Sequence, residues 1–104
     1  MKRLTYNIAR GRSDWDGGPF CYQEVKGWTT QTSGLAVRND DRLKWTPWGV
    51  DHLASGLNVG KHFATRTDAI AYAERLGTLG VDWTQSLEVI QTPEVRDLVM
   101  GVAA

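Results

Sequence analysis

Residues 45–77 constrain the fold of this chain more than any other stretch, because they predict a β-hairpin that continues directly into an amphipathic helix. Two runs rich in strand-forming residues, 48–53 and 57–63, lie on either side of the turn-forming sequence 54–56. A helix that packs on one face of such a hairpin covers the apolar side of its strands. About a third of the chain therefore predicts the centre of a small α+β domain.

The pairing within this hairpin depends on the length of its turn. With a two-residue turn, Ala54 pairs with Leu57 and Trp48 pairs with Phe63. A three-residue loop shifts the register and moves part of the apolar face to the other side. The two-residue register places four apolar side chains on the face that a helix would cover: Trp48, Val50, Val59 and Phe63.

The helix expected over residues 66–76 has the clearest boundaries in the sequence. Thr65 is a suitable N-cap, and Asp68 stands three residues later, where a capping box has its acidic member. Gly77 is predicted to end the helix in the left-handed conformation. Four residues at helical spacing form one apolar stripe that would pack on the sheet: Ala69, Tyr72, Ala73 and Leu76.

The N-terminal part of the chain predicts two further strands. Residues 4–9 alternate apolar and polar side chains, as a half-buried strand does, and Gly11 would end that strand. Residues 13–19 are rich in turn formers, and residues 20–25 could form a second short strand. Residues 26–34 are polar and predict a loop, although their threonines would tolerate an edge strand.

Another strand pair is expected just before the hairpin. Residues 35–38 predict a strand that enters a turn at residues 39–41, and residues 43–45 predict the returning strand. Pro47 has no N–H group to donate to a ladder, so it should stand at a strand start, at an edge or at a bulge.

Helices are expected at the C-terminal end. Asp82 can cap a short helix over residues 83–90, and a strand through residues 87–89 is the alternative. Thr92 and Pro93 are typical of an N-cap and a first-turn residue, so a last helix should begin there. Its apolar stripe would consist of Val95, Leu98, Val99 and Val102.

These elements together predict a single α+β domain over residues 1–104, mainly β over 1–63 and mainly α over 65–104. The domain should contain a small antiparallel sheet of three to five strands, one Ala-rich helix packed on it, and one or two C-terminal helices. A single cysteine, Cys21, excludes an internal disulfide and suits a reducing compartment. With no apolar run long enough for a membrane span, the expected location is the cytoplasm, without a membrane partner.

The residue types that could carry catalysis or hold a metal do not form a recognisable set. Asp14 and Asp16 adjoin a glycine turn, but their surroundings lack the further oxygen ligands that calcium needs. His52, His62 and Cys21 are too few and too widely spaced for a zinc site. The sequence therefore predicts a protein that is not an enzyme and that has no cofactor and no metal.

Tryptophan content and charge distribution favour a binding role. Five tryptophans are many for 104 residues, and we expect most of them in the core and one or two at a binding surface. The net charge is zero, yet residues 1–66 carry ten Lys/Arg against six Asp/Glu, and residues 67–104 carry two against six. Such asymmetry can indicate a charged binding face, although acidic helix surfaces alone would also produce it.

Residues 45–77 also resemble a small module in which antiparallel strands precede an Ala-rich helix. The residues that carry the resemblance are Trp48, Val50, Ser55, Gly56, Val59, Phe63, Thr65, Arg66, Ala69, Tyr72, Ala73 and Leu76. This pattern is similar to the AP2-type DNA-binding domain and to the arm-site-binding domain of phage integrases. The resemblance implies a sheet face that enters the major groove of DNA. The contact residues that it implies are Arg38, Arg42, Lys44, Trp45, Lys61 and Arg66.

Two functional hypotheses follow from these observations. The leading one is a non-enzymatic binding module, a small phage or prophage accessory protein that acts by occupying a protein partner. The alternative is nucleic-acid binding, specifically DNA, through the sheet face. Residues 35–66 carry five Lys/Arg against three Asp, which is a small surplus for a specific DNA-binding surface, so a protein partner is preferred.

Overall fold

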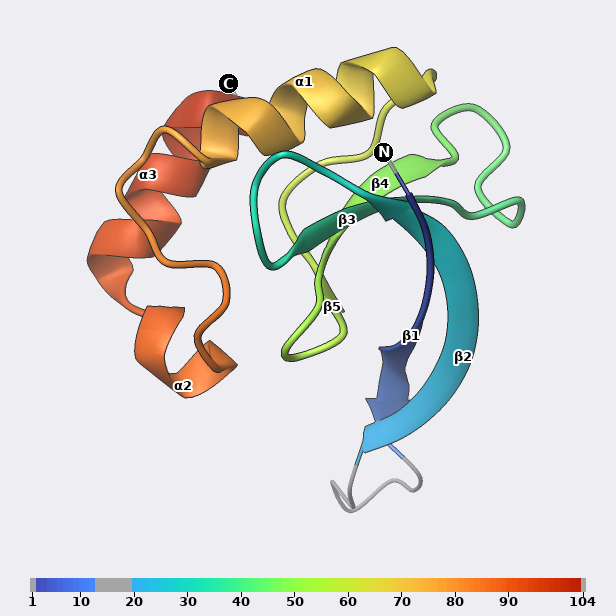
Figure 1. Ribbon diagram of the computed structural model, residues 1–104, viewed down its shortest axis with the longest axis horizontal. Helices are drawn as coiled ribbons and strands as arrows, with labels where there is room; N and C mark the ends of the chain where they lie inside the picture. Colours follow the sequence, from blue (N-terminus) through green and yellow to red (C-terminus); the bar gives the residue numbers. More distant parts are fainter. Residues whose placement is uncertain (1, 13–19, 104) are drawn as a thin grey trace.

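The computed structural model describes residues 2–12 and 20–103, which form an antiparallel sheet followed by helices (Figure 1). The sheet order is β1-β2-β3-β4-β5, so each strand pairs with the next one in the chain. The strands are β1 (Arg3–Arg12), β2 (Phe20–Thr29), β3 (Leu35–Asn39), β4 (Trp48–His52) and β5 (Leu57–Asn58), and the helices are α1 (Arg66–Leu76), α2 (Leu87–Ile90) and α3 (Pro93–Ala103). The predicted α+β class is therefore confirmed.

The hairpin of β1 and β2 is longer than the sequence predicts. Its register runs from Arg3 opposite Trp28 to Ala9 opposite Tyr22, and β1 continues past Gly11, which does not end it. The loop predicted over residues 26–34 is wrong for residues 26–29, because the end of β2 pairs with both β1 and β3. The turn predicted over residues 13–19 lies outside the described residues.

The central hairpin combines a correct pairing with an incorrect turn. Trp48 and Phe63 exchange backbone hydrogen bonds of 3.0 and 2.7 Å, as the two-residue register predicts. At the turn, however, His52 pairs with Leu57, so four residues connect the strands and the predicted pairing of Ala54 with Leu57 is wrong. The register therefore changes between Asn58 and Phe63, so that Trp48 still pairs with Phe63. The four predicted apolar side chains, Trp48, Val50, Val59 and Phe63, all pack in or against the core.

The segment before the hairpin does not form the returning strand predicted over residues 43–45. Residues 40–45 form turns instead, in which the Leu43 N–H donates to the Asp40 carbonyl oxygen at 3.0 Å. Pro47 directly precedes β4, as its missing N–H predicts, and its carbonyl oxygen accepts from the Asp40 N–H at 2.7 Å. The Arg42 N–H donates to a carboxylate oxygen of Asp40 at 3.2 Å, a contact typical of a turn.

Helix α1 follows the prediction closely and lies across the sheet (Figure 1). The Thr65 hydroxyl accepts the Asp68 N–H at 3.2 Å, which caps the first turn. The predicted stripe of Ala69, Tyr72, Ala73 and Leu76 is fully buried against Leu35, Val37 and Val50. Gly77, by contrast, is not left-handed, since its φ is −65°. A Cβ there would collide with the Thr32 hydroxyl, so close approach is what requires the glycine.

The C-terminal helices differ from the prediction in their length and in the side chains that they bury. Helix α2 is confirmed over Leu87–Ile90 against the strand alternative, but residues 83–86 before it form a turn. The Trp83 indole N–H donates to the Leu76 carbonyl oxygen at 3.0 Å, which holds that turn on α1. Helix α3 starts after Thr92, whose hydroxyl accepts the Val95 N–H at 3.2 Å. Leu98 was expected in the core and is instead 42% exposed.

We expect the Gly60→Ala variant to lose roughly 2–4 kcal/mol of unfolding free energy. Gly60 has a φ of 72°, and an added Cβ would overlap the buried Tyr72 hydroxyl. Gly80→Ala isolates the conformational cost, because Gly80 has a similar φ of 75° with open space around it, and should lose about 1–2 kcal/mol. Chemical unfolding measures both. Equal losses at the two positions would contradict the close packing of Tyr72.

Candidate functional site

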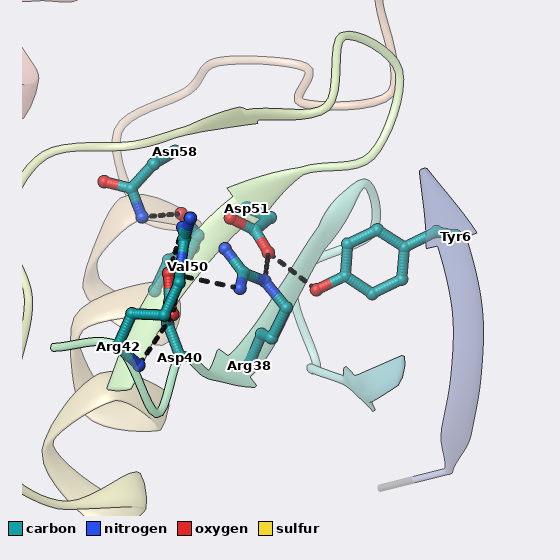
Figure 2. A network of polar contacts seen from close by, with 7 residues as sticks. All are labelled: Tyr6, Arg38, Asp40, Arg42, Val50, Asp51 and Asn58. Carbon is teal, nitrogen blue, oxygen red and sulfur yellow. Dashed lines mark hydrogen bonds and ion pairs between the residues drawn. The ribbon is translucent and has the colours of Figure 1, made fainter. Parts of the chain in front are cut away.

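The sheet face that points away from α1 contains a buried carboxylate. Asp51, on β4, is only 1% exposed. One of its carboxylate oxygens accepts the Arg38 Nε–H at 2.8 Å and the Tyr6 hydroxyl at 2.7 Å (Figure 2). These partners come from β3 and β1, so the contact brings the first strand over the middle of the sheet. The Ala9 N–H reinforces this contact by donating to the Gly56 carbonyl oxygen at 2.9 Å.

A second carboxylate extends this polar network at the end of β3. Asp40 accepts two hydrogen bonds from the Arg42 guanidinium, at 3.0 Å from Nε and 2.9 Å from Nη2. The Arg38 Nη1 atom lies 3.6 Å from the same carboxylate. Arg38 therefore lies between two acids, with a side chain only 10% exposed (Figure 2).

Both Asp51 partners remain protonated well beyond neutral pH. Burial, followed by the negative charge of Asp51, raises the pKa of the Tyr6 hydroxyl. Burial alone would lower the pKa of Arg38, but the hydrogen bond to Asp51 and the charge of Asp51 outweigh it, so the pKa is raised. Neither group exchanges a proton near pH 7, which makes the network a structural device and a poor acid–base site.

The six sequence-predicted contact residues lie in different surroundings. Arg38 and Arg42 belong to the acidic network just described. Lys44 and Trp45 lie in the loop between β3 and β4, with the Lys44 Nζ atom 5.4 Å from the ring centroid of Trp45, which is 79% exposed. Lys61 lies 5.7 Å from the ring of Phe63, and Arg66 lies 5.5 Å from the ring of Trp28. The structure does not assemble all six into one surface.

The sequence did not point to a cationic and aromatic cluster at the start of β1. The Arg3 guanidinium lies 4.7 Å from the Trp28 ring centroid, on which Arg66 also converges. The Trp28 ring lies 5.7 Å from that of Trp48. Residues from β1, β2, β4 and α1 meet here, so only the strand register combined with the helix position could have predicted the cluster.

A groove lies between β5 and the two C-terminal helices. Its main cavity, of about 350 Å³, has a predominantly apolar lining that includes Leu57, Leu87, Val99 and Met100. A neighbouring depression of about 330 Å³ shares Ser55, Leu57 and Leu87 with it and extends to Tyr22 and Glu88. Tyr22 and Met100 are 59% and 62% exposed, so the groove presents large apolar groups to solvent.

A serine–histidine pair forms part of the groove lining. The His52 Nε2 atom lies 3.0 Å from the Gln85 carbonyl oxygen, which only accepts, so Nε2 carries the proton. In the neutral ring Nδ1 then accepts from the Ser55 hydroxyl at 2.7 Å. The Ser55 oxygen also accepts the Leu57 N–H at 3.2 Å. These bonds connect the β4–β5 turn to residue 85, and they account for the burial of the imidazole without a catalytic role.

Two further properties bear on the class of site. Among the described residues, no three His, Cys, Asp or Glu side chains converge in a way that could hold a metal ion. The helices in the described part of the chain are too short or too polar to cross a bilayer.

Comparison with known proteins finds no matching family model, no matching curated protein and no matching solved structure. The resemblance to DNA-binding modules over residues 45–77 stays a prediction.

The Tyr6–Asp51 contact predicts a specific loss of stability in alkali. The unfolded chain releases the tyrosine proton near pH 10, whereas the folded chain retains it because the pKa of Tyr6 is raised. The free energy of unfolding should therefore fall above about pH 10, by up to about 1.4 kcal/mol per pH unit for this group.

Tyr6→Phe should flatten this pH dependence in unfolding titrations between about pH 9 and 11.5. Part of the dependence should remain, because burial also raises the pKa of Tyr72. Tyr22→Phe, at an exposed position, provides the matched control. The same slope in the wild type and in Tyr6→Phe would contradict the assignment.

Proposed function

We propose that this protein is a non-enzymatic binding module that acts by occupying a protein partner, as an accessory protein of a phage or prophage would. The observation that carries the proposal is the groove between β5, α2 and α3. It is the place where an apolar cavity and large exposed apolar side chains coincide. Such patches on small proteins are typical of protein interaction sites.

Two exposed apolar side chains line this groove, and two others lie elsewhere on its helices. Met100 and Tyr22 line its two parts, and Val89 and Leu98, on α2 and α3, are 58% and 42% exposed. Met100 adds a flexible side chain that adapts to different shapes, a property common at protein-binding surfaces. Burying these groups would supply the hydrophobic free energy that a partner needs.

The groove lining carries one charge of each sign. Arg96 lines the main cavity, and Glu88 lines the neighbouring depression. Because these two charges balance, apolar contact is the main feature that a partner can recognise here. We therefore assign the groove to an apolar segment of a partner protein.

Site-specific photocrosslinking can identify the partner. A photoreactive amino acid at position 100, inside the groove, should capture a protein that the same group at position 45 does not capture. Trp45 is the control position because its side chain is also apolar and exposed, but lies in the loop between β3 and β4.

Binding measurements with the purified partner then test the site. Met100→Ala should weaken binding about tenfold, the typical effect of truncating an energetically important interface residue. Trp45→Ala should leave the affinity within about twofold. Loss of binding in Trp45→Ala but not in Met100→Ala would contradict the proposal. So would catalytic turnover of a nucleotide or nucleic acid that one polar substitution abolishes.

A further inference from the structure

Two guanidinium groups converge on one indole at the start of the sheet. Arg3, on β1, lies 4.7 Å from the Trp28 ring centroid, and Arg66, the first residue of α1, lies 5.5 Å from it. Both arginines are exposed, while Trp28 is half-buried and packs against the core. Stacking on a fixed ring restricts the motion of each guanidinium but leaves its N–H groups free for another acceptor.

Among the residues that the structure describes, neither guanidinium has a carboxylate partner, in contrast to Arg38 and Arg42. Within the described residues, neither Arg3 nor Arg66 forms an ion pair with Glu24, in β2, or with Asp68, in the first turn of α1. Two like charges held near one ring repel each other, and the face of the indole offsets only part of that repulsion. An anion that accepts hydrogen bonds from both groups would remove the remaining cost.

Further cations and aromatic rings continue the cluster in both directions. Lys26 and Arg3 line one shallow depression of about 350 Å³ and lie on the same face of the β1–β2 hairpin. On the other side, Trp48 lies 5.7 Å from Trp28 and pairs with Phe63, next to which Lys61 is placed. The basic residues Lys26, Arg3, Arg66 and Lys61 thus accompany the rings of Trp28, Trp48 and Phe63.

We propose that this cationic and aromatic cluster binds single-stranded nucleic acid. Arg3 and Arg66 contact backbone phosphates, and the partly exposed aromatic rings contact unpaired bases. Proteins bind single strands in this way, with cations along the backbone and aromatic rings against the bases. A duplex keeps its bases stacked inside, so the aromatic members of the cluster would have no role with it.

The cluster shares no residue with the groove proposed to bind a protein partner. It also differs from the sheet face that points away from α1, where Arg38 is already bonded to Asp51. The proposal is therefore independent of the proposed function, and either can fail without the other.

Fluorescence anisotropy with labelled oligonucleotides tests the proposal. Single-stranded DNA and RNA of equal length, the corresponding duplex and unlabelled heparin as a competitor should be measured at a low and a moderate salt concentration. The single strands should bind, more tightly than the duplex, and heparin should compete less well than unlabelled single strand. The DNA and RNA arms identify which sugar is preferred.

Arg3→Gln and Arg66→Gln should each weaken single-strand binding roughly tenfold. Each should also lower the slope of log affinity against log salt by about 0.7. Lys44→Gln, which removes a different exposed cation beside a tryptophan, should change neither. Both arginines are exposed, so unfolding curves of the variants should match the wild type.

Three results would overturn the proposal. The first is no single-strand binding at low salt, and the second is binding that neither arginine substitution weakens. The third is competition by heparin, or binding of the duplex, equal to that of the single strand, which would indicate general attraction to polyanions.

Discussion

The carboxylate of Asp51 is the constraint on which the arrangement of the sheet depends. A buried, ionised carboxylate costs several kcal/mol unless a cation and hydrogen-bond donors surround it. Arg38 supplies the cation from the neighbouring strand, but Tyr6 comes from β1, which stands three positions away in the sheet. The contact therefore requires a strongly bent sheet, in which β1 covers one face while α1 covers the other (Figure 1).

The arginines of the sheet and of α1 differ in whether a carboxylate binds them. Arg38 and Arg42 are bonded to Asp51 and Asp40, whereas Arg3 and Arg66 gather around Trp28 on the face that α1 covers. The basic and aromatic cluster around Trp28 and the apolar groove beside β5 are thus two separate surfaces.

Local signals in the sequence predicted local structure, and pairing between distant residues decided the rest. Helix α1 and its cap depend on side chains within one turn of each other, so Thr65 and the apolar stripe could be predicted. The turn of the central hairpin could not, because the Ser55–His52 contact and the fixed pair of Trp48 and Phe63 set its length. The cluster around Trp28 depends on the register of β1 on β2. That register could not be predicted, because the polar residues around Trp28 favoured a loop.

The central claim is that Tyr6, Arg38 and Asp51 fill the sheet face that points away from α1, and that nucleic acid binds instead at the cluster around Trp28. Side-chain NMR of the arginine Nε–H groups and tryptophan indoles during titration with a single-stranded oligonucleotide tests this claim most directly. The signals of Arg3, Arg66 and Trp28 should shift, while the Arg38 Nε–H signal should stay unchanged and exchange slowly with solvent. A shift or rapid exchange of the Arg38 signal, with those of Arg3 and Arg66 unmoved, would contradict the account.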